Sequence, residues 1–399
     1  MVSMLTRKLR RDLMGMKGQV ITIALVVAAG VASMVMYLSG YESLIEAQRS
    51  FYARARFADA FVEMRRAPLA LASRIGEIPG VSAWETRLVA QFLLDMPKVV
   101  EPVAARILSL PEFGEPRLNR PFLRRGRMPE SNRGGEVLVN EGFAAAHGLT
   151  PGDRITAIVN GRRQALRVTG IALSPEYIFA MSGGSIMPDD LRFGVFWMPE
   201  PALAAAFDLK GAFNSASVTL AAGASLPAVL AALDALAAPY GSLGAYGRSD
   251  QLSHRLLSDE IRQQRTMATV VPPIFLTVAC FLVFIVTGRL VRVQREQIAS
   301  LKALGYSNRD IGLHFVQMVS VIILIGSVVG VIQGSAAGSA ITDLYRDFFR
   351  FPILEFQIPV FYALLATGTS WGAAMAGALT SVRWATRLPP AHSPAAPGS

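Results

Sequence analysis

The sequence has one cysteine and few charged residues, and each of these features excludes some classes of protein. Cys280 has no partner in the chain, which excludes a disulfide framework within it. There is no G-x-x-x-x-G-K-[ST] motif, so the chain cannot bind and hydrolyse ATP in the P-loop manner. There is no H-E-x-x-H motif, and the four histidines show no metal-ligand spacing. We therefore expect no catalytic residue, no metal and no cofactor.

Charge is also missing from four long apolar stretches, residues 20–38, 267–287, 315–342 and 359–382. About 20 residues of helix cross the ~30 Å hydrocarbon core of a bilayer, and a charge at its centre costs about 2.5–3.5 kcal/mol. The composition agrees, with 52% hydrophobic and 17% charged residues. The predicted fold class is an α-helical membrane protein with four transmembrane helices in a 1+3 layout. A large α+β extracytoplasmic domain lies between helices one and two.

Basic residues in the short flanks predict the orientation. The segment before the first span has one acid, Asp12, against Arg7, Lys8, Arg10, Arg11 and Lys17. The 289–314 loop has Glu296 and Asp310 against Arg289, Arg292, Arg295, Lys302 and Arg309. The positive-inside rule then places both termini and this loop in the cytoplasm. The first apolar stretch is longer than that of a signal peptide and lacks an A-x-A site, which favours an uncleaved anchor.

These predictions divide the chain into nine segments. They are a cytoplasmic segment (1–18), transmembrane helix 1 (19–40), a periplasmic α+β domain (41–266), transmembrane helix 2 (267–288), a cytoplasmic coupling loop (289–314), transmembrane helix 3 (315–342), a periplasmic loop (343–358), transmembrane helix 4 (359–382) and a cytoplasmic tail (383–399).

The inserted domain shows alternating strand and helix patterns. Its clearest unit has a strand at 136–140, a helix at 141–147 and two strands at 154–159 and 164–171. A hairpin turn at Asn160-Gly161 joins the last two. The pattern predicts an α+β or ferredoxin-like body, which could form two lobes.

Small residues recur at four-residue spacing in the last two spans. The third span has Gly326, Gly330, Gly334 and Gly338, and the fourth has Gly368, Gly372 and Ala376. Such faces let helix backbones approach closely, either within the chain or across a dimer, and the sequence leaves both open. The spans contain no Asp, Glu, Lys or Arg, which disfavours a polar substrate pathway through the bundle.

The loop between the second and third spans has the pattern of two short helices. Residues 295–304 place Ile298, Leu301 and Leu304 on one side, and Gly305 suits a helix C-terminus. Ser307 and Asp310 have the spacing of a capping box at the start of the next helix. The first helix could dock on a cytoplasmic partner or lie on anionic lipid.

The span layout and two segments resemble the FtsX/MacB-type (type VII) ABC transporter permeases in a single-repeat form. The segments are R-E-Q-I-A-S-L-K-A-L-G-Y-S-N-R-D-I (295–311) and G-E-V-L-V-N-E-G-F-A-A-A-H-G-L-T-P-G-D-R-I (135–155). The resemblance implies a MacB-like periplasmic core domain and a coupling helix that docks on a separate ATPase. The coupling motif falls on Glu296, Ser300, Leu301, Lys302, Ala303, Leu304, Gly305 and Tyr306. Two departures limit the comparison: no ATPase domain is fused to the chain, and only one permease repeat is present.

By the same resemblance, the expected partners are an ABC-type ATPase, a second permease copy in a homodimer or heterodimer, membrane lipid and, in some systems, a periplasmic adaptor. No nucleic acid partner is expected. The implied location is the bacterial inner membrane. The implied function is to couple ATP hydrolysis to motion of the periplasmic domain, for export or extraction of a lipid, lipoprotein or peptide. A mechanotransmission regulator of an envelope enzyme and a sensor subunit are the alternatives.

Overall fold

The computed structural model describes residues 4–96, 99, 101–181, 188–294, 307–357 and 359–386. These residues form two compact units. Unit 1 draws on Met1–Ser43, Ile261–Asp343 and Glu355–Ser399, and unit 2 draws on Leu44–Glu260 and Leu344–Leu354. Each unit is described by itself below.

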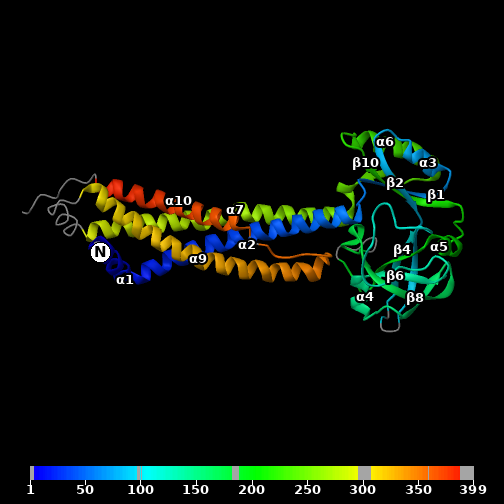
Figure 1. Cartoon of the computed structure of the whole chain (residues 1–399), viewed down its shortest axis with the longest axis horizontal. Coiled ribbons are helices and arrows are strands. Elements are labelled where there is room, and N and C mark those ends of the chain that lie inside the picture. Colours follow the sequence, from blue (N-terminus) through cyan, green and yellow to red (C-terminus); the bar gives the residue numbers. More distant parts are fainter. Residues whose placement is uncertain are drawn as a thin grey trace, which may run out of the picture. The chain divides into compact units, whose positions relative to one another are not determined.

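Unit 1 is a bundle of long helices (Figure 1). Its helices are α1 (Met4–Gly15), α2 (Lys17–Ala55), α7 (Leu252–Val293), α9 (Asn308–Phe349) and α10 (Val360–Thr386). Helices α2, α7 and α9 also contribute residues to unit 2. Small and β-branched residues dominate the buried core of the bundle, including Val27, Val31, Val35, Ala279, Val283, Val319, Ile322, Ala374 and Ala378.

Three helices of the described chain are long and apolar enough to cross a membrane. They are Lys17–Ala55, Leu252–Val293 and Asp310–Arg346. Helix α10 has 27 residues and is not among them. Its middle carries Gly368, Thr369, Ser370 and Gly372, which lower its hydropathy although it holds no charge between residues 359 and 382. The structure therefore shows three apolar helices, and the predicted count of four spans stays a prediction.

One lobe of unit 2 is built on a four-stranded antiparallel sheet in the order β11-β1-β10-β2. Its strands are β1 (Ala60–Pro68), β2 (Val81–Arg87), β10 (Ala212–Leu220) and β11 (Ala245–Gly247). Helices α3 (Leu71–Gly76) and α6 (Leu226–Ala237) pack on one face through Leu71, Ile75, Val229 and Leu233 (Figure 1). This βαβ–βαβ arrangement is ferredoxin-like, as the sequence predicted, with a second lobe inserted between β2 and β10.

The second lobe is a seven-stranded mixed sheet in the order β5-β8-β6-β9-β4-β3-β7. An additional pairing between β7 and β8 closes six of these strands into a barrel, which leaves fewer exposed edges. The strands are β3 (Val89–Asp95), β4 (Val103–Leu110), β5 (Phe122–Gly126), β6 (Glu136–Asn140), β7 (Arg154–Val159), β8 (Arg162–Leu173) and β9 (Phe193–Pro199). Helices α4 (Glu141–His147) and α5 (Glu200–Ala206) pack against them. Single 3₁₀ turns occur at Pro175–Tyr177, Ala238–Tyr240 and Arg248–Asp250.

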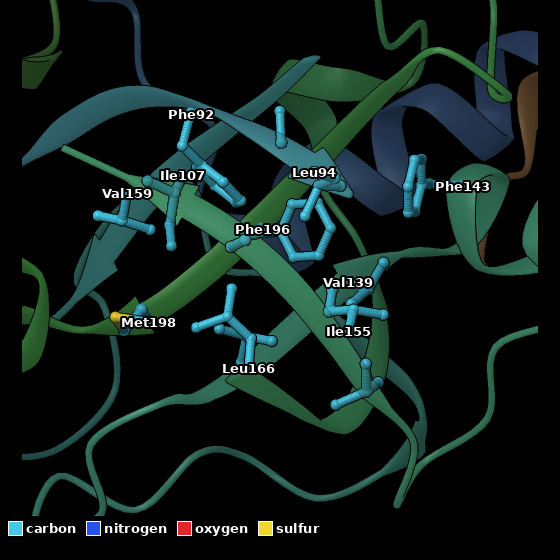
Figure 2. Packing of buried hydrophobic residues seen from close by; sticks show 14 of the residues in the cluster. Phe92, Leu94, Ile107, Val139, Phe143, Ile155, Val159, Leu166, Phe196 and Met198 are labelled. Carbon is cyan, nitrogen blue, oxygen red and sulfur yellow. The ribbon is translucent and has the colours of Figure 1, made fainter. Parts of the chain in front are cut away.

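The barrel interior is apolar and rich in aromatic rings. Figure 2 shows Phe92, Phe143 and Phe196 meeting among aliphatic side chains from several strands. The ring centroids of Phe143 and Phe196 are 5.5 Å apart, and those of Phe92 and Phe196 are also 5.5 Å apart, both edge-on. Gly194 in β9 makes room for this cluster, because a Cβ there would lie 2.9 Å from the Phe143 ring. The second lobe thus has a core of its own.

Candidate coupling end and helix contacts

The predicted ATPase-coupling residues Glu296, Ser300, Leu301, Lys302, Ala303, Leu304, Gly305 and Tyr306 lie outside the described residues. The chain is described again from Ser307, which begins α9 with reciprocal bonds to Asp310. The backbone N–H and the hydroxyl of Ser307 donate to Asp310 Oδ2 at 2.9 and 2.6 Å. The Asp310 N–H donates back to Ser307 Oγ at 3.2 Å. The predicted capping box is therefore confirmed.

A buried polar cluster joins α1 to the residue that follows α7 and to the second turn of α9. Lys8 Nζ donates to Asp12 Oδ2 at 2.5 Å and to the side-chain oxygen of Gln294 at 2.9 Å. Asp12 Oδ2 also lies 3.2 Å from Nε2 of His314, whose side chain is only 4% exposed. Gln294 directly follows α7 and His314 lies in the second turn of α9. In the sequence, Asp12 is only a lone acid among bases, and nothing there indicates this cluster.

Three glycines of α9 lie directly against the backbone of α2. A Cβ added to Gly326, Gly330 or Gly334 would meet a carbonyl oxygen of α2 at 2.7, 2.7 or 2.6 Å. These oxygens belong to Ala24, Ala28 and Ala32, one helical turn apart. The backbones of the two helices are therefore in direct contact, and only glycine fits at these three positions of α9.

The other predicted packing glycines have different surroundings. A Cβ on Gly338 would meet the Phe356 ring at 2.4 Å, so this position contacts a side chain and not a helix backbone. On Gly368 or Gly372 of α10 it would meet nothing within 4 Å. Gly377, which the sequence analysis did not single out, instead faces Cys280 of α7, with 2.5 Å to its carbonyl oxygen.

Within unit 2, one buried and one half-buried ion pair join the two lobes. Arg87 of β2 forms two 2.5 Å bonds to the carboxylate of Glu176, and these side chains are 12% and 6% exposed. Arg106 of β4 pairs with Glu63 of β1. Burial alone would lower the pKa of Arg87, but the adjacent Glu176 carboxylate raises it above its usual range. Both arginines are therefore fully charged and tie one lobe to the other.

Backbone groups at the lobe junction are also capped by side chains. The Asn214 amide accepts from the Val89 N–H and donates to the Val89 carbonyl, both at 2.7 Å. The Leu88 N–H donates to Ser109 Oγ at 2.9 Å. Side-chain hydrogen bonds thus fix the backbone of Leu88 and Val89, where the chain passes from β2 to β3, and this crossover is not a free hinge.

The part of the chain that the structure describes shows no group of His, Cys, Asp or Glu that could hold a metal ion. The described residues form long apolar helices with polar contacts at their ends, and a separate two-lobed α+β domain. They define a multi-pass membrane protein with a large α+β domain.

Sequence comparison then gives the family. The model of the MacB-like periplasmic core domain matches residues 18–236, more than half of the chain. The model of the FtsX-like permease C-terminal domain matches residues 269–390. The chain therefore belongs to the FtsX/MacB-type ABC transporter permeases. No curated protein matches it.

Two solved structures illustrate the similarity. One is the periplasmic region of MacB from Actinobacillus actinomycetemcomitans, with 10% identity and a TM-score of 0.32 over 51% of this chain and 92% of that one. The other is the extracellular domain of the noncanonic ABC-type transporter YknZ from Gram-positive bacteria, with 11% identity and a TM-score of 0.31 over 48% of this chain and 98% of that one. At these TM-scores, the family assignment rests on the two sequence models.

Proposed function

We propose that the chain is the membrane-spanning subunit of an ABC transporter. In this role it couples ATP hydrolysis by a separate ATPase to motion of a periplasmic domain. The family membership supports the ATPase partner and a second permease copy in general terms. The cargo that fits the class is a lipid, lipoprotein or peptide that is exported or extracted from the membrane. The bundle carries motion and is not the route for a polar substrate, because its apolar stretches hold no charged residue.

The proposed topology has four spans in a 1+3 layout in the inner membrane, with both termini in the cytoplasm. Helix α10 is the fourth span, because its 27 residues at ~1.5 Å rise are long enough for the hydrocarbon core and its apolar part holds no charge. The test uses cysteines placed at Gly161 and Ser300 in a Cys280→Ala chain. Labelling with an impermeant reagent in intact and opened cells should put them on opposite sides of the membrane. Labelling from the same side contradicts the topology.

The observation that carries the proposal is the 295–311 segment, together with the confirmed capping box that begins α9 directly after it. In the proposed coupling helix, Leu301 faces the ATPase and Gly305 ends the helix. A carboxylate at position 301 would therefore cost several kcal/mol of docking free energy, because it would be buried in an apolar interface. A proline at position 305 would destabilise the end of the coupling helix, because proline cannot adopt positive φ and has no N–H to donate.

The experiment is co-purification of the full chain with candidate ATPases. We expect Leu301→Asp and Gly305→Pro to lose the ATPase without losing membrane insertion. Ala299→Asp is the matched control, since it adds the same charge on the side of the predicted helix opposite to Leu301, and it should retain the ATPase. Unchanged co-purification of Leu301→Asp rules out docking through this helix.

A non-transporting regulator remains the second candidate, and one observation favours it. The two lobes of unit 2 are joined by two ion pairs, of which Arg87–Glu176 is buried, and by side-chain bonds to the backbone, which suits a domain that moves as one piece. A permease that only switches an envelope enzyme would need this stiffness but no cargo site. Deletion of the gene in a strain where cargo release and cell-wall hydrolysis are both measured separates the two functions.

A further inference from the structure

Helix α1 has two faces with different surroundings. Leu9 and Leu13 pack against the apolar core of unit 1, and Asp12 is buried beside them. On the other side lie the exposed side chains of Arg7, Arg10 and Arg11, and Met14 is 61% exposed. Among the described residues, none of these three guanidinium groups has a carboxylate partner. The charged face of α1 thus forms no ion pair with the described residues.

The position of α1 in the chain restricts where this face can lie. Only Met16 separates α1 from α2, and the uncharged stretch of α2 begins at residue 20. A 12-residue helix joined without a linker to a spanning helix lies at the level of the lipid headgroups. Arginines in that layer meet phosphates, and an apolar side chain such as Met14 can enter the acyl boundary.

The buried face of α1 connects this surface to the loop between α7 and α9. Lys8 bonds to Gln294 at the end of α7, and Asp12 contacts His314 near the start of α9. Lys8 and Asp12 also bond to each other, so one short helix contacts both the residue that follows α7 and the second turn of α9. A shift of α1 would therefore move both of these segments together.

We propose that α1 is a docking surface for anionic lipid headgroups, and that a bound headgroup layer holds both ends of the coupling loop through Asp12. The lipid contact stands independently of the ATPase, whereas the effect on coupling rests on the proposed function. Charge complementarity selects the lipid: three unpaired arginines at headgroup level each strengthen binding about fivefold, or about a hundredfold together. An acidic surface of the ATPase is the competing occupant.

The first test is a lipid titration of the full-length protein in detergent, followed by thermal unfolding. Phosphatidylglycerol should raise the unfolding temperature of the wild type and phosphatidylcholine should not. The R7Q/R10Q/R11Q variant should need about a hundredfold more phosphatidylglycerol for the same effect. The control R154Q/R162Q/R167Q removes equal charge from exposed positions of unit 2 and should respond like the wild type. If the triple variant does not fold, Arg10→Gln alone should weaken the response about fivefold.

An equal response of the wild type to both lipids, or an unchanged response of R7Q/R10Q/R11Q, overturns the lipid assignment. Loss of ATPase co-purification in that variant without any lipid effect also overturns it, and identifies the ATPase as the occupant. Because the titration contains no ATPase, its outcome does not depend on whether Leu301→Asp disrupts docking. The two proposals can thus fail separately.

The second test measures hydrogen exchange in nanodiscs of either lipid. Amides of residues 290–294 and 310–314 should exchange several-fold more slowly in phosphatidylglycerol. Asp12→Asn should abolish this difference while its phosphatidylglycerol titration stays like that of the wild type. If Asp12→Asn keeps the protection, the link from α1 to the loop is refuted.

Discussion

Replacing Gly330 by alanine tests the closest helix contact in unit 1. The added Cβ would lie 2.7 Å from the Ala28 carbonyl oxygen and 2.7 Å from Cβ of Val31. Both distances are well below van der Waals contact, and one partner is backbone, so α2 and α9 must separate. Overpacking of this kind costs about 1–3 kcal/mol, offset by up to about 1 kcal/mol from the better helix propensity of alanine. Because two atoms lie at 2.7 Å, the overpacking cost falls in the upper part of this range, about 2–3 kcal/mol, and the expected net loss is about 1–2 kcal/mol.

The single cysteine provides the assay. Cys280 of α7 is half-buried, and its sulfur lies 3.2 Å from where a Cβ on Gly377 of α10 would be. A thiol-reactive dye added during heating of the full-length protein should therefore report opening of the bundle. Gly330→Ala should shift the labelling midpoint to lower temperature by a few degrees.

Gly372→Ala is the matched control, because it makes the same change in another helix of unit 1 where nothing lies within 4 Å. It should leave the midpoint unchanged or raise it slightly. A Gly330→Ala protein as stable as the wild type would show that the two helices are not in backbone contact. Equal destabilisation by both variants would refute the reasoning from local space.

Three further outcomes are expected. Arg87→Met should destabilise unit 2 by about 3–5 kcal/mol in denaturant unfolding, since it leaves the Glu176 carboxylate buried without its cation. Glu136→Gln should lower stability at neutral pH, because the hydrogen bond from Arg127 lowers the pKa of Glu136 below its ordinary 4.5. A lowered acid pKa adds stability above pH 4.5, so the difference from wild type should shrink as pH falls through the lowered value. Asp310→Ala should remove about 1 kcal/mol of capping, seen as faster hydrogen exchange in the first turn of α9.

Local structure could be predicted from the sequence where turn chemistry sets it. The predicted strand, helix and strand at 136–140, 141–147 and 154–159 have the same bounds in the structure. The hairpin that follows uses Asn160 and Gly161, which both adopt positive φ, the conformation that this residue pair favours. The order of strands and helices predicted an α+β or ferredoxin-like body, and the structure has the ferredoxin-like topology in one of its two lobes.

Pairing over long sequence separations could not be predicted in this way. Only Leu88 separates β2 from β3, yet the two strands belong to different sheets. The β7–β8 hairpin was predicted from its turn, but the pairing of β3 with β7 that completes the barrel leaves no mark on strand periodicity. Likewise, nothing in the sequence near Asp12 indicates contacts with residues about 300 positions away. The residues implied by the family resemblance for ATPase coupling stay a prediction.

The two ion pairs between the lobes of unit 2 are better explained by geometry than by stability. A buried pair such as Arg87–Glu176 contributes little more to stability than apolar residues of similar size, because desolvation offsets the attraction. It does, however, fix direction, since the guanidinium of Arg87 donates two parallel hydrogen bonds to the carboxylate, and these require the two groups to lie near one plane. Together with Arg106–Glu63, it holds two lobes that are otherwise joined at strand ends in one relative orientation. For a domain whose proposed task is to carry motion, a fixed orientation matters more than a few kcal/mol, because a loose junction would absorb the movement before it reached a partner.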